Sequence, residues 1–254
     1  MILRKWKALP SEMQCEEVKK YYDILKRKKG SLFFKRVFDF LLSSLLIVVL
    51  SPLFLCLAVS IKIDSRGPVF FRQVRVTRYG ETFRIFKFRT MVADAEKTGP
   101  RVTVKNDARI TRVGKFVRKY RLDEVCQLLD VWRGKMTFVG TRPEVEKYVA
   151  HYTPEMRATL LLPAGITSEA SIYYRDESDL LDGENGDTEN IYLEKILPEK
   201  MKYNLRAVER FSLFREWGIM IKTVLAVCGK NCRDNDRQER ETMTVEKEQK
   251  IDKK

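Results

Sequence analysis

The sequence predicts a helix-rich α+β protein with a membrane helix near its N-terminus. One apolar run, residues 37–61, is long enough for a membrane segment, and residues 69–76 and 83–89 have the short alternating patterns of paired strands. Apolar residues at helical spacing follow over 125–132. With 254 residues, 44% of them hydrophobic, the chain can bury a sizeable core. The expected parts are a basic extension over 1–31, a membrane helix over 32–62, a folded domain over 63–228 and a charged, disordered tail over 229–254.

The apolar run over 37–61 contains one charge, Asp39, and a Ser51-Pro52 pair near its centre. Proline removes a backbone hydrogen bond and clashes with the preceding turn, so the helix should break there. Residues 1–36 carry eleven Lys and Arg against four acidic residues, and a second basic segment follows the run. Because positive flanks prefer the cytoplasm, we predict a re-entrant helix that enters and leaves through one leaflet. A buried helix of a soluble protein is the alternative.

Positive charge is concentrated in residues 62–122. They hold seventeen Lys and Arg against five Asp and Glu, a net charge of +12 out of the chain's +14. Such a concentration indicates a site for an anionic partner. The alternative is a solvated basic surface, or one that faces the membrane.

The cysteine pattern and the single histidine limit which metal ion the chain could bind. The five cysteines are scattered, which argues against a disulfide framework or a zinc knuckle and favours a reducing compartment. His151 is the single histidine, so a transition-metal site rich in imidazole is not expected. A metal bound by this chain should be a hard cation such as Mg²⁺, held by carboxylates and phosphates.

The segments 69–76 and 83–89 are predicted to form a hairpin with a turn over 78–81. The second strand alternates between apolar and basic side chains. Its basic residues should therefore lie on or near the open face of the hairpin. They are Arg84, Lys87 and Arg89.

A helix should begin at Leu122 or Asp123 and end before Gly134, with the acidic pair Asp123 and Glu124 in its first turn. In this position Asp123 could simply cap the helix, with Glu124 complementing the helix dipole. However, the pair directly follows the most basic part of the chain. A carboxylate among groups that bind phosphate suits nucleophilic phosphoryl chemistry.

Other elements are expected along the chain. Residues 92–109 form a loop, Arg142-Pro143 opens a helix that reaches about Val149, and residues 178–190 form a mobile acidic loop. Residues 205–227 form one amphipathic helix, which could lie at the membrane interface or pack on the domain core.

Residues 32–228 resemble the bacterial sugar transferase family, the monotopic phosphoglycosyl transferases. The resemblance depends on several strings that occur in one order. These are the apolar segment with Ser51-Pro52, Phe86-Lys-Phe-Arg-Thr-Met91, Leu122-Asp-Glu, Gly134-Lys-Met-Thr-Phe-Val-Gly140, Arg142-Pro143 and Gly165-Ile-Thr167.

The resemblance implies that a sugar 1-phosphate moves from a UDP-sugar to undecaprenyl phosphate. UMP is released, the reaction passes through a phosphosugar-aspartate intermediate, and Mg²⁺ is the cofactor. The implied protein is bound to membrane lipids at the bacterial cytoplasmic membrane, with the catalytic domain of residues 63–228 on the cytoplasmic face. It starts glycan assembly and has no nucleic-acid partner, and a homodimer is left open.

The resemblance also implies roles for single residues. Asp123 would be the nucleophile and a ligand of Mg²⁺, and Glu124 would assist metal placement or proton handling. Arg118 and Arg142 would bind phosphate through their forked guanidinium groups. Lys87 and Arg89 are further candidates for substrate binding, with anionic lipid headgroups as their alternative partner.

The chain departs from the family pattern at two places. Gly140-Thr-Arg-Pro143 stands where the family has Gly-Pro-Arg-Pro, and Pro163-Ala-Gly165 stands where many members have Arg-Pro-Gly. The second departure removes a basic contact and leaves donor recognition open. Two other functions remain: a nonenzymatic, membrane-tethered protein that binds nucleic acid or acidic lipid, and a glycosyltransferase that releases UDP instead of UMP.

Overall fold

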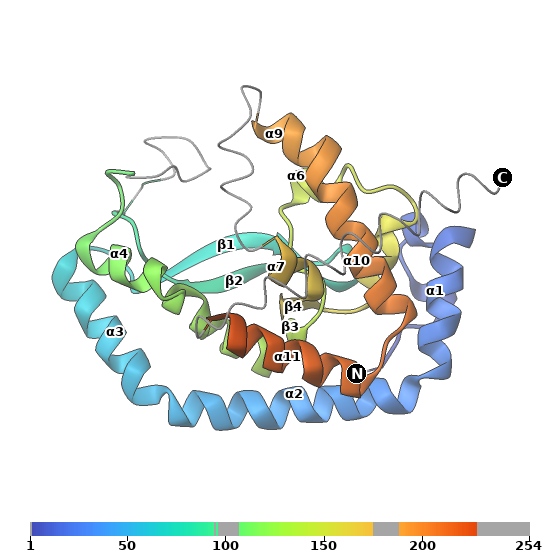
Figure 1. Cartoon of the computed structure of the whole chain (residues 1–254), viewed down its shortest axis with the longest axis horizontal. Coiled ribbons are helices and arrows are strands. Elements are labelled where there is room, and N and C mark those ends of the chain that lie inside the picture. The colour runs from blue at the N-terminus through green and yellow to red at the C-terminus, as the bar shows by residue number, and fades with distance from the viewer. Residues whose placement is uncertain (1, 94, 96–106, 175–187, 228–254) are drawn as a thin grey trace. The chain divides into compact units, whose positions relative to one another are not determined.

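The computed structural model describes residues 2–93, 95, 107–174 and 188–227, and the chain divides into two compact units, Met1–Ile166 and Thr167–Lys254. Helices predominate, and the described strands form two sheets of two strands each (Figure 1). The predicted helix-rich α+β class is therefore confirmed. The predicted tail over 229–254, most of the acidic loop over 178–190 and much of the loop over 92–109 lie outside the described residues.

The apolar run of the first unit forms two helices, α2 (Lys29–Val49) and α3 (Ser51–Asp64), which meet at an angle of 60°. Pro52 lies in the first turn of α3, where its missing N–H costs no hydrogen bond. The Ser51 hydroxyl donates to the carbonyl of Val48 at 2.8 Å, which satisfies a carbonyl at the end of α2. No single helix among the described residues meets the length and hydropathy of a membrane span, whereas this bent pair together does. The predicted break is confirmed.

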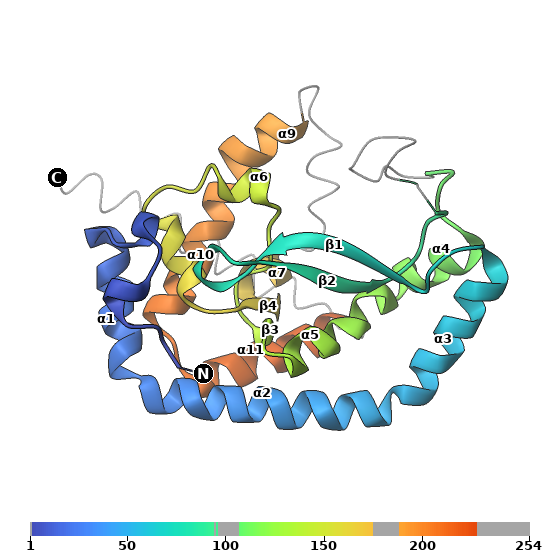
Figure 2. The ribbon, with the colours of Figure 1, turned by 180° about the vertical axis from the view of Figure 1, so that it is seen from behind.

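The predicted hairpin is confirmed as β1 (Phe70–Val76) and β2 (Thr82–Phe88), paired antiparallel with Phe70 opposite Phe88 and Val76 opposite Thr82. The turn contains the short helix η3 (Arg78–Gly80), in which Tyr79 has a φ of 60°. The hairpin is the long twisted ribbon in the middle of Figure 2. Both faces of β2 contribute buried apolar side chains, so the hairpin is part of the core.

One apolar core connects α3 to the hairpin and to the segment that carries the acidic pair. Burial of these side chains removes apolar surface from water and fixes the elements against one another. Phe54 of α3 contacts the edge of Phe88 with ring centroids 5.8 Å apart. The buried members of the cluster are Leu57, Ile61, Phe86, Phe88, Val117 and Cys126.

The helix predicted over 122–133 has two parts. Helix α4 (Arg112–Lys119) ends, Arg121 turns the chain in the left-handed conformation with a φ of 54°, and a 3₁₀ helix η4 (Leu122–Gln127) begins. It continues directly into α5 (Leu128–Trp132). Arg121 occupies the N-cap position, so Asp123 lies inside the first turn and is not the cap.

The second small sheet pairs β3 (Met136–Val139) with β4 (Ala164–Thr167). Beyond β3, the N–H of Gly165 donates to the carbonyl of Thr141 at 2.8 Å. A Cβ at Gly165 would lie 2.2 Å from the backbone nitrogen of Gly140, so a side chain does not fit. The two glycines therefore allow β4 to lie directly against the chain that leads to Arg142.

The helix predicted from Arg142 to Val149 is wrong for its first half, because only α6 (Glu146–Val149) is helical. The carbonyl of Glu144 instead accepts a hydrogen bond from the N–H of Val76 at 2.9 Å. This bond holds the Arg142 segment extended beside the end of β1.

The N-terminal extension, predicted only as basic, is folded onto the first unit. It forms η1 (Trp6–Ala8), η2 (Ser11–Met13) and α1 (Glu16–Arg27). Helix α1 packs against η5 (Met156–Leu161), where the Tyr21 hydroxyl donates to Glu155 at 2.7 Å. The buried apolar side chains of the extension are Leu3, Leu9, Met13, Val18, Tyr21, Tyr22 and Leu25.

The second unit is helical. Its described elements are α7 (Glu169–Tyr173), α9 (Thr188–Ile191), the π-helix η6 (Tyr192–Ile196), α10 (Leu197–Glu209) and α11 (Leu213–Val227). The single helix predicted over 205–227 is wrong, because the chain breaks between α10 and α11 at a buried Phe211. Arg215 forms a bidentate ion pair with Glu169, which joins α11 to α7.

Substitution of Gly165 tests the close contact between β4 and the chain after β3. We expect Gly165→Ala to lower the free energy of unfolding by about 1–3 kcal/mol, because overpacking forces backbone shifts. Thermal denaturation in lipid nanodiscs would measure this change. The control is Gly30→Ala, since a Cβ at Gly30 has no atom within 4 Å. That variant should be unchanged or slightly more stable, and equal melting of both variants would contradict the contact.

Candidate active site

The candidate site is assembled from three segments of the first unit. Strand β2 supplies Lys87, η4 supplies Asp123 and Glu124, and the extended chain after β3 supplies Arg142. The Phe86 and Cys126 side chains in the core beneath fix β2 against η4. The fold therefore brings together residues that are up to 55 positions apart in the sequence, counted from 87 to 142.

Glu124 is held between two cations. Its Oε1 atom accepts hydrogen bonds from Lys87 Nζ at 2.9 Å and from Arg142 Nη2 at 2.6 Å, and its Oε2 atom lies 3.3 Å from Arg142 Nη1. Burial by itself would raise the pKa of Glu124, but the charges and hydrogen bonds of Arg142 and Lys87 outweigh burial and hold that pKa far below its usual range. Glu124 is therefore ionised at any physiological pH.

Asp123 has the opposite electrostatic environment. Burial raises the pKa of its carboxyl group, the charge of Glu124 raises it further, and the charges of Lys87 and Arg118 only partly oppose this. Among the described residues, no other side chain donates a hydrogen bond to the Asp123 carboxylate. Two adjacent carboxylates thus have different environments, and Asp123 is the one whose oxygens are available to a ligand.

Arg118 reaches the site from α4. Its Nε atom donates to the Thr90 hydroxyl at 2.8 Å, which fixes the plane of the guanidinium. Burial lowers the pKa of Arg118, while the charges of Asp123 and Asp107 raise it, and the group remains charged. Its two terminal nitrogens donate to no described residue, so the fork is available for a phosphate group.

Arg89 does not join this group. Arg89 is 5% exposed, and its guanidinium donates to the carbonyls of Ser65 at 2.7 Å and Arg66 at 2.8 Å, just beyond the end of α3. A Cβ at Gly67 would clash with the same guanidinium, so glycine is needed there. The structure places Arg89 at the end of the bent helix pair, and its suggested role in substrate binding stays a prediction.

Asp130, which connects β2 to α5, was not among the residues predicted for the site. Its Oδ2 atom accepts a hydrogen bond from the N–H of Phe86 at 2.8 Å, on the edge of β2 that no described strand covers. Burial raises the pKa of Asp130 to about 6, and the hydrogen bond from Phe86 and the charges of Arg72 and Arg133 oppose that rise. The sequence does contain a signal for a buried acid at this position, because Asp130 stands alone among the apolar residues Leu128, Leu129 and Val131.

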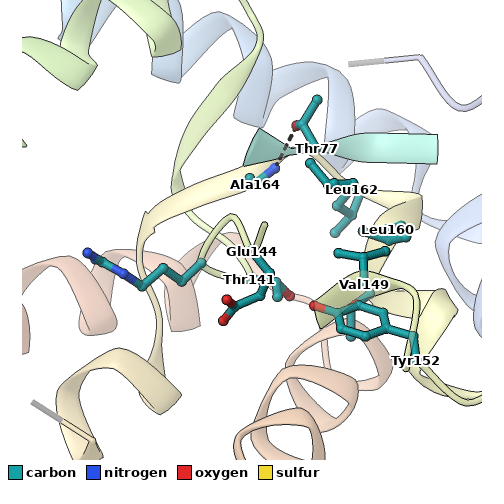
Figure 3. A pocket seen from close by; sticks show the side chains of 11 residues that line it. Thr77, Thr141, Glu144, Val149, Tyr152, Leu160, Leu162 and Ala164 are labelled. Carbon is teal, nitrogen blue, oxygen red and sulfur yellow. Dashed lines mark hydrogen bonds between the residues drawn. The ribbon is translucent and has the colours of Figure 1, made fainter. Parts of the chain in front are cut away.

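A small pocket adjoins the Arg142 segment, and apolar side chains line it together with polar residues that include Thr77, Glu144 and Tyr152. Figure 3 shows the Thr77 hydroxyl accepting a hydrogen bond from the N–H of Ala164, at 3.1 Å. The same hydroxyl donates to the carbonyl of Lys135 at 2.8 Å. Burial and the nearby charge of Glu144 raise the pKa of Tyr152. The extended chain that carries Arg142 thus forms part of the wall of this pocket.

No group of three or more His, Cys, Asp or Glu side chains that could enclose a metal occurs within the described part of the chain. Asp123 and Glu124 provide two carboxylates. Mg²⁺ in phosphate chemistry is commonly held by one or two carboxylates plus the oxygens of the substrate, so the available donors fit that ion when a diphosphate is bound.

The structure thus brings two adjacent carboxylates together with Lys and Arg side chains, and such an arrangement is typical of sites that bind anionic groups. The chain belongs to the bacterial sugar transferase family, whose sequence model matches residues 30–230. The family assignment suggested by the sequence is thus confirmed.

Several curated proteins are similar to this chain. A UDP-glucose:undecaprenyl-phosphate glucose-1-phosphate transferase of Klebsiella pneumoniae is 34% identical over 197 residues, which cover 76% of this chain and 40% of that protein. A UDP-N-acetylgalactosamine-undecaprenyl-phosphate N-acetylgalactosaminephosphotransferase of Aeromonas hydrophila is 33% identical, and the match covers 77% of this chain and 44% of that protein. A UDP-glucose:undecaprenyl-phosphate glucose-1-phosphate transferase of Caulobacter vibrioides is 34% identical, and the match covers 75% of this chain and 68% of that protein. The chain thus spans about two fifths of the length of the first two relatives.

Removal of the Asp130 carboxylate should disturb β2. Asp130→Ala leaves the buried N–H of Phe86 without an acceptor, so we expect a loss of about 1–3 kcal/mol in the free energy of unfolding. Asp130→Asn retains an acceptor oxygen and should lose less. Chemical denaturation of both variants would measure the difference. If the two variants are equally stable, the bond does not hold the strand.

Proposed function

We propose that this protein transfers a sugar 1-phosphate from a UDP-sugar to undecaprenyl phosphate and releases UMP. The observation that carries the proposal is the different environment of the two adjacent carboxylates. Glu124 is bound by Lys87 and Arg142, whereas the Asp123 carboxylate accepts no bond from another described side chain. The similar proteins named above as sugar-phosphate transferases acting with undecaprenyl phosphate support the choice of substrates.

In the first step, a carboxylate oxygen of Asp123 attacks the phosphorus that bears the sugar. The bond between that phosphorus and the bridging oxygen breaks, and UMP leaves with the bonding electrons. The result is an acyl phosphate between Asp123 and the sugar, which divides a difficult transfer into two easier steps. Because burial and the charge of Glu124 raise the pKa of Asp123, its ionised carboxylate is a stronger nucleophile than that of an ordinary aspartate.

In the second step, a phosphate oxygen of undecaprenyl phosphate attacks the same phosphorus. The bond to Asp123 breaks, the carboxylate is regenerated, and the product is a polyprenyl diphosphate sugar. No oxidant or further reactant is needed. The acceptor carries its phosphate at the membrane surface, so this step requires the site to lie close to that surface.

The surrounding cations stabilise charge on the phosphoryl oxygens and the departing UMP. Arg118 presents a guanidinium fork toward this region, and Arg142 and Lys87 share the charge of Glu124. Glu124 thereby keeps two cations beside Asp123 before the substrate binds. Mg²⁺ would be held by Asp123 together with diphosphate oxygens, with Glu124 as the second carboxylate, and it would neutralise charge on the leaving group.

The bent pair α2 and α3 would enter one leaflet and return through it. Large apolar side chains are exposed on both helices, which suits lipid contact. They include Phe34, Leu41 and Val48 on α2 and Leu55 and Ile63 on α3. The basic residues before and after the pair favour the cytoplasmic side for both ends. The site would then face the cytoplasm, where UDP-sugars are available, as the first membrane step of glycan assembly.

A direct assay tests the proposal. The purified protein is incubated with Mg²⁺, undecaprenyl phosphate and a panel of UDP-sugars that includes UDP-glucose and UDP-N-acetylgalactosamine, and released nucleotides are separated. UMP is expected. UDP would indicate a glycosyltransferase that cleaves the bond between sugar and phosphate, and no nucleotide with any donor would favour a binding protein.

Asp123→Asn should reduce turnover by at least 10³-fold, because an amide does not attack phosphorus. Incubation with a UDP-sugar labelled in the sugar should label the wild-type protein but not this variant. The matched control is Asp23→Asn on α1, which lies outside the site. Full activity of Asp123→Asn would remove this residue from the mechanism.

Topology can be measured with cysteines introduced into a chain that lacks its native ones. We expect Lys5→Cys and Arg240→Cys both to be protected from a membrane-impermeant thiol reagent in intact cells, because a re-entrant pair leaves both ends in the cytoplasm. Labelling after permeabilisation is the control for reactivity. Labelling of position 5 alone in intact cells would establish a spanning segment and overturn the re-entrant proposal.

A further inference from the structure

The one acidic residue of the apolar run does not face outward. Asp39 and Lys35, one turn apart on α2, are each only 2% exposed. The Thr137 hydroxyl of β3 donates to Asp39 Oδ2 at 2.6 Å, and Lys35 Nζ donates to the carbonyl of Val139 at 3.1 Å. The two charges lie 4.0 Å apart and form a buried ion pair. We call Lys35, Asp39 and Thr137 the α2 junction.

The α2 junction contacts the strand that leads into the site. Val139 ends β3 and is three residues before Arg142, which binds Glu124. Arg36 adds a second connection, because its Nη1 and Nη2 atoms donate to the carbonyls of Val131 at 2.7 Å and Trp132 at 2.8 Å. Those carbonyls lie at the end of α5, the helix that continues the segment carrying Asp123.

The other helix of the pair, α3, is joined to the segment that follows β2 and to α4. Arg89, two residues after Lys87, donates to carbonyls at and beyond the end of α3. The N–H of Val113 near the start of α4 donates to Asp64 of α3 at 2.9 Å. Helix α2 is thus bonded to the strand that precedes Arg142, and α3 is bonded to the segment that follows Lys87. Arg142 and Lys87 are the two cations that pair with Glu124.

Buried charges of this kind are costly to leave unpaired, so they hold the helix in one position relative to the domain. Such rigidity matters differently for the two substrates. A UDP-sugar is soluble and reaches Asp123 at any height above the bilayer. The acceptor phosphate is kept at the headgroup level by its long lipid chain, so its attack depends on where the bent pair places the site.

Building on the proposed function, we propose that Lys35, Asp39 and Thr137 are positioning residues for the acceptor step. They fix the height of Asp123 and Arg142 relative to the membrane surface by joining α2 to β3. Loosening this junction should impair attack by the lipid phosphate and leave the reaction of Asp123 with the UDP-sugar intact.

The test uses the full chain in nanodiscs and measures the two steps separately. Step one is the single-turnover release of UMP without acceptor, and step two is transfer from the labelled protein to undecaprenyl phosphate. Thr137→Val removes the donor to Asp39, and the double variant Lys35→Met with Asp39→Leu replaces the ion pair by apolar groups of similar length, a change that proteins often tolerate. Ser44→Ala is the matched control, because that hydroxyl bonds only within α2.

We expect Thr137→Val and the double variant to release UMP within about twofold of the wild-type rate and to slow transfer to undecaprenyl phosphate by about tenfold or more, which corresponds to about 1.4 kcal/mol. A short-chain polyprenyl phosphate that is soluble in water should restore transfer, because it does not depend on height. Thermal denaturation confirms that the variants are folded.

Three results would overturn the inference while leaving the proposed function in place. The first is an equal loss of rate in UMP release and in transfer. The second is a wild-type rate of both steps in Thr137→Val and in the double variant. The third is a loss of transfer to the short-chain acceptor equal to the loss with undecaprenyl phosphate. The absence of UMP release from the wild-type protein would instead reject the proposed function, and the inference with it.

Discussion

The site depends on Glu124, whose carboxylate joins β2 to the chain after β3. Without it, Lys87 and Arg142 would be two like charges converging on one region. The ion pairs also explain why two neighbouring acids differ. Glu124 accepts the hydrogen bonds of Lys87 and Arg142, which lower its pKa, and its own negative charge raises the pKa of Asp123. One residue therefore pairs with both cations and raises the pKa of the carboxyl group beside it.

The sequence predicted those parts of the fold that depend on local patterns. Alternation placed both strands of the hairpin correctly, and the Ser51-Pro52 pair located the bend, because proline acts through its own ring and missing N–H. The acidic pair was correctly placed in a first helical turn. Its association with Lys87 and Arg142 could not be deduced, since these bonds form only after distant segments pack together.

The two helices that were wrongly predicted have physical explanations of the same kind. Residues after Arg142 stay extended because the carbonyl of Glu144 is used by the N–H of Val76, a tertiary bond that competes with helix formation. The helix expected over 205–227 is interrupted where Phe211 turns into the interior, next to Ser212, a residue type that favours helix starts. In both cases burial or pairing overrode a weak local preference.

The N-terminal extension shows how the beginning of the chain acts on the hairpin. The Arg4 guanidinium lies over the ring of Tyr79 at 4.6 Å and pairs with Glu81, and the Tyr22 hydroxyl donates to the Arg4 carbonyl at 2.9 Å. Leu3 is buried beside them. Any affinity tag or fusion partner joined next to Leu3 would therefore adjoin a packed interface that reaches the turn of the hairpin.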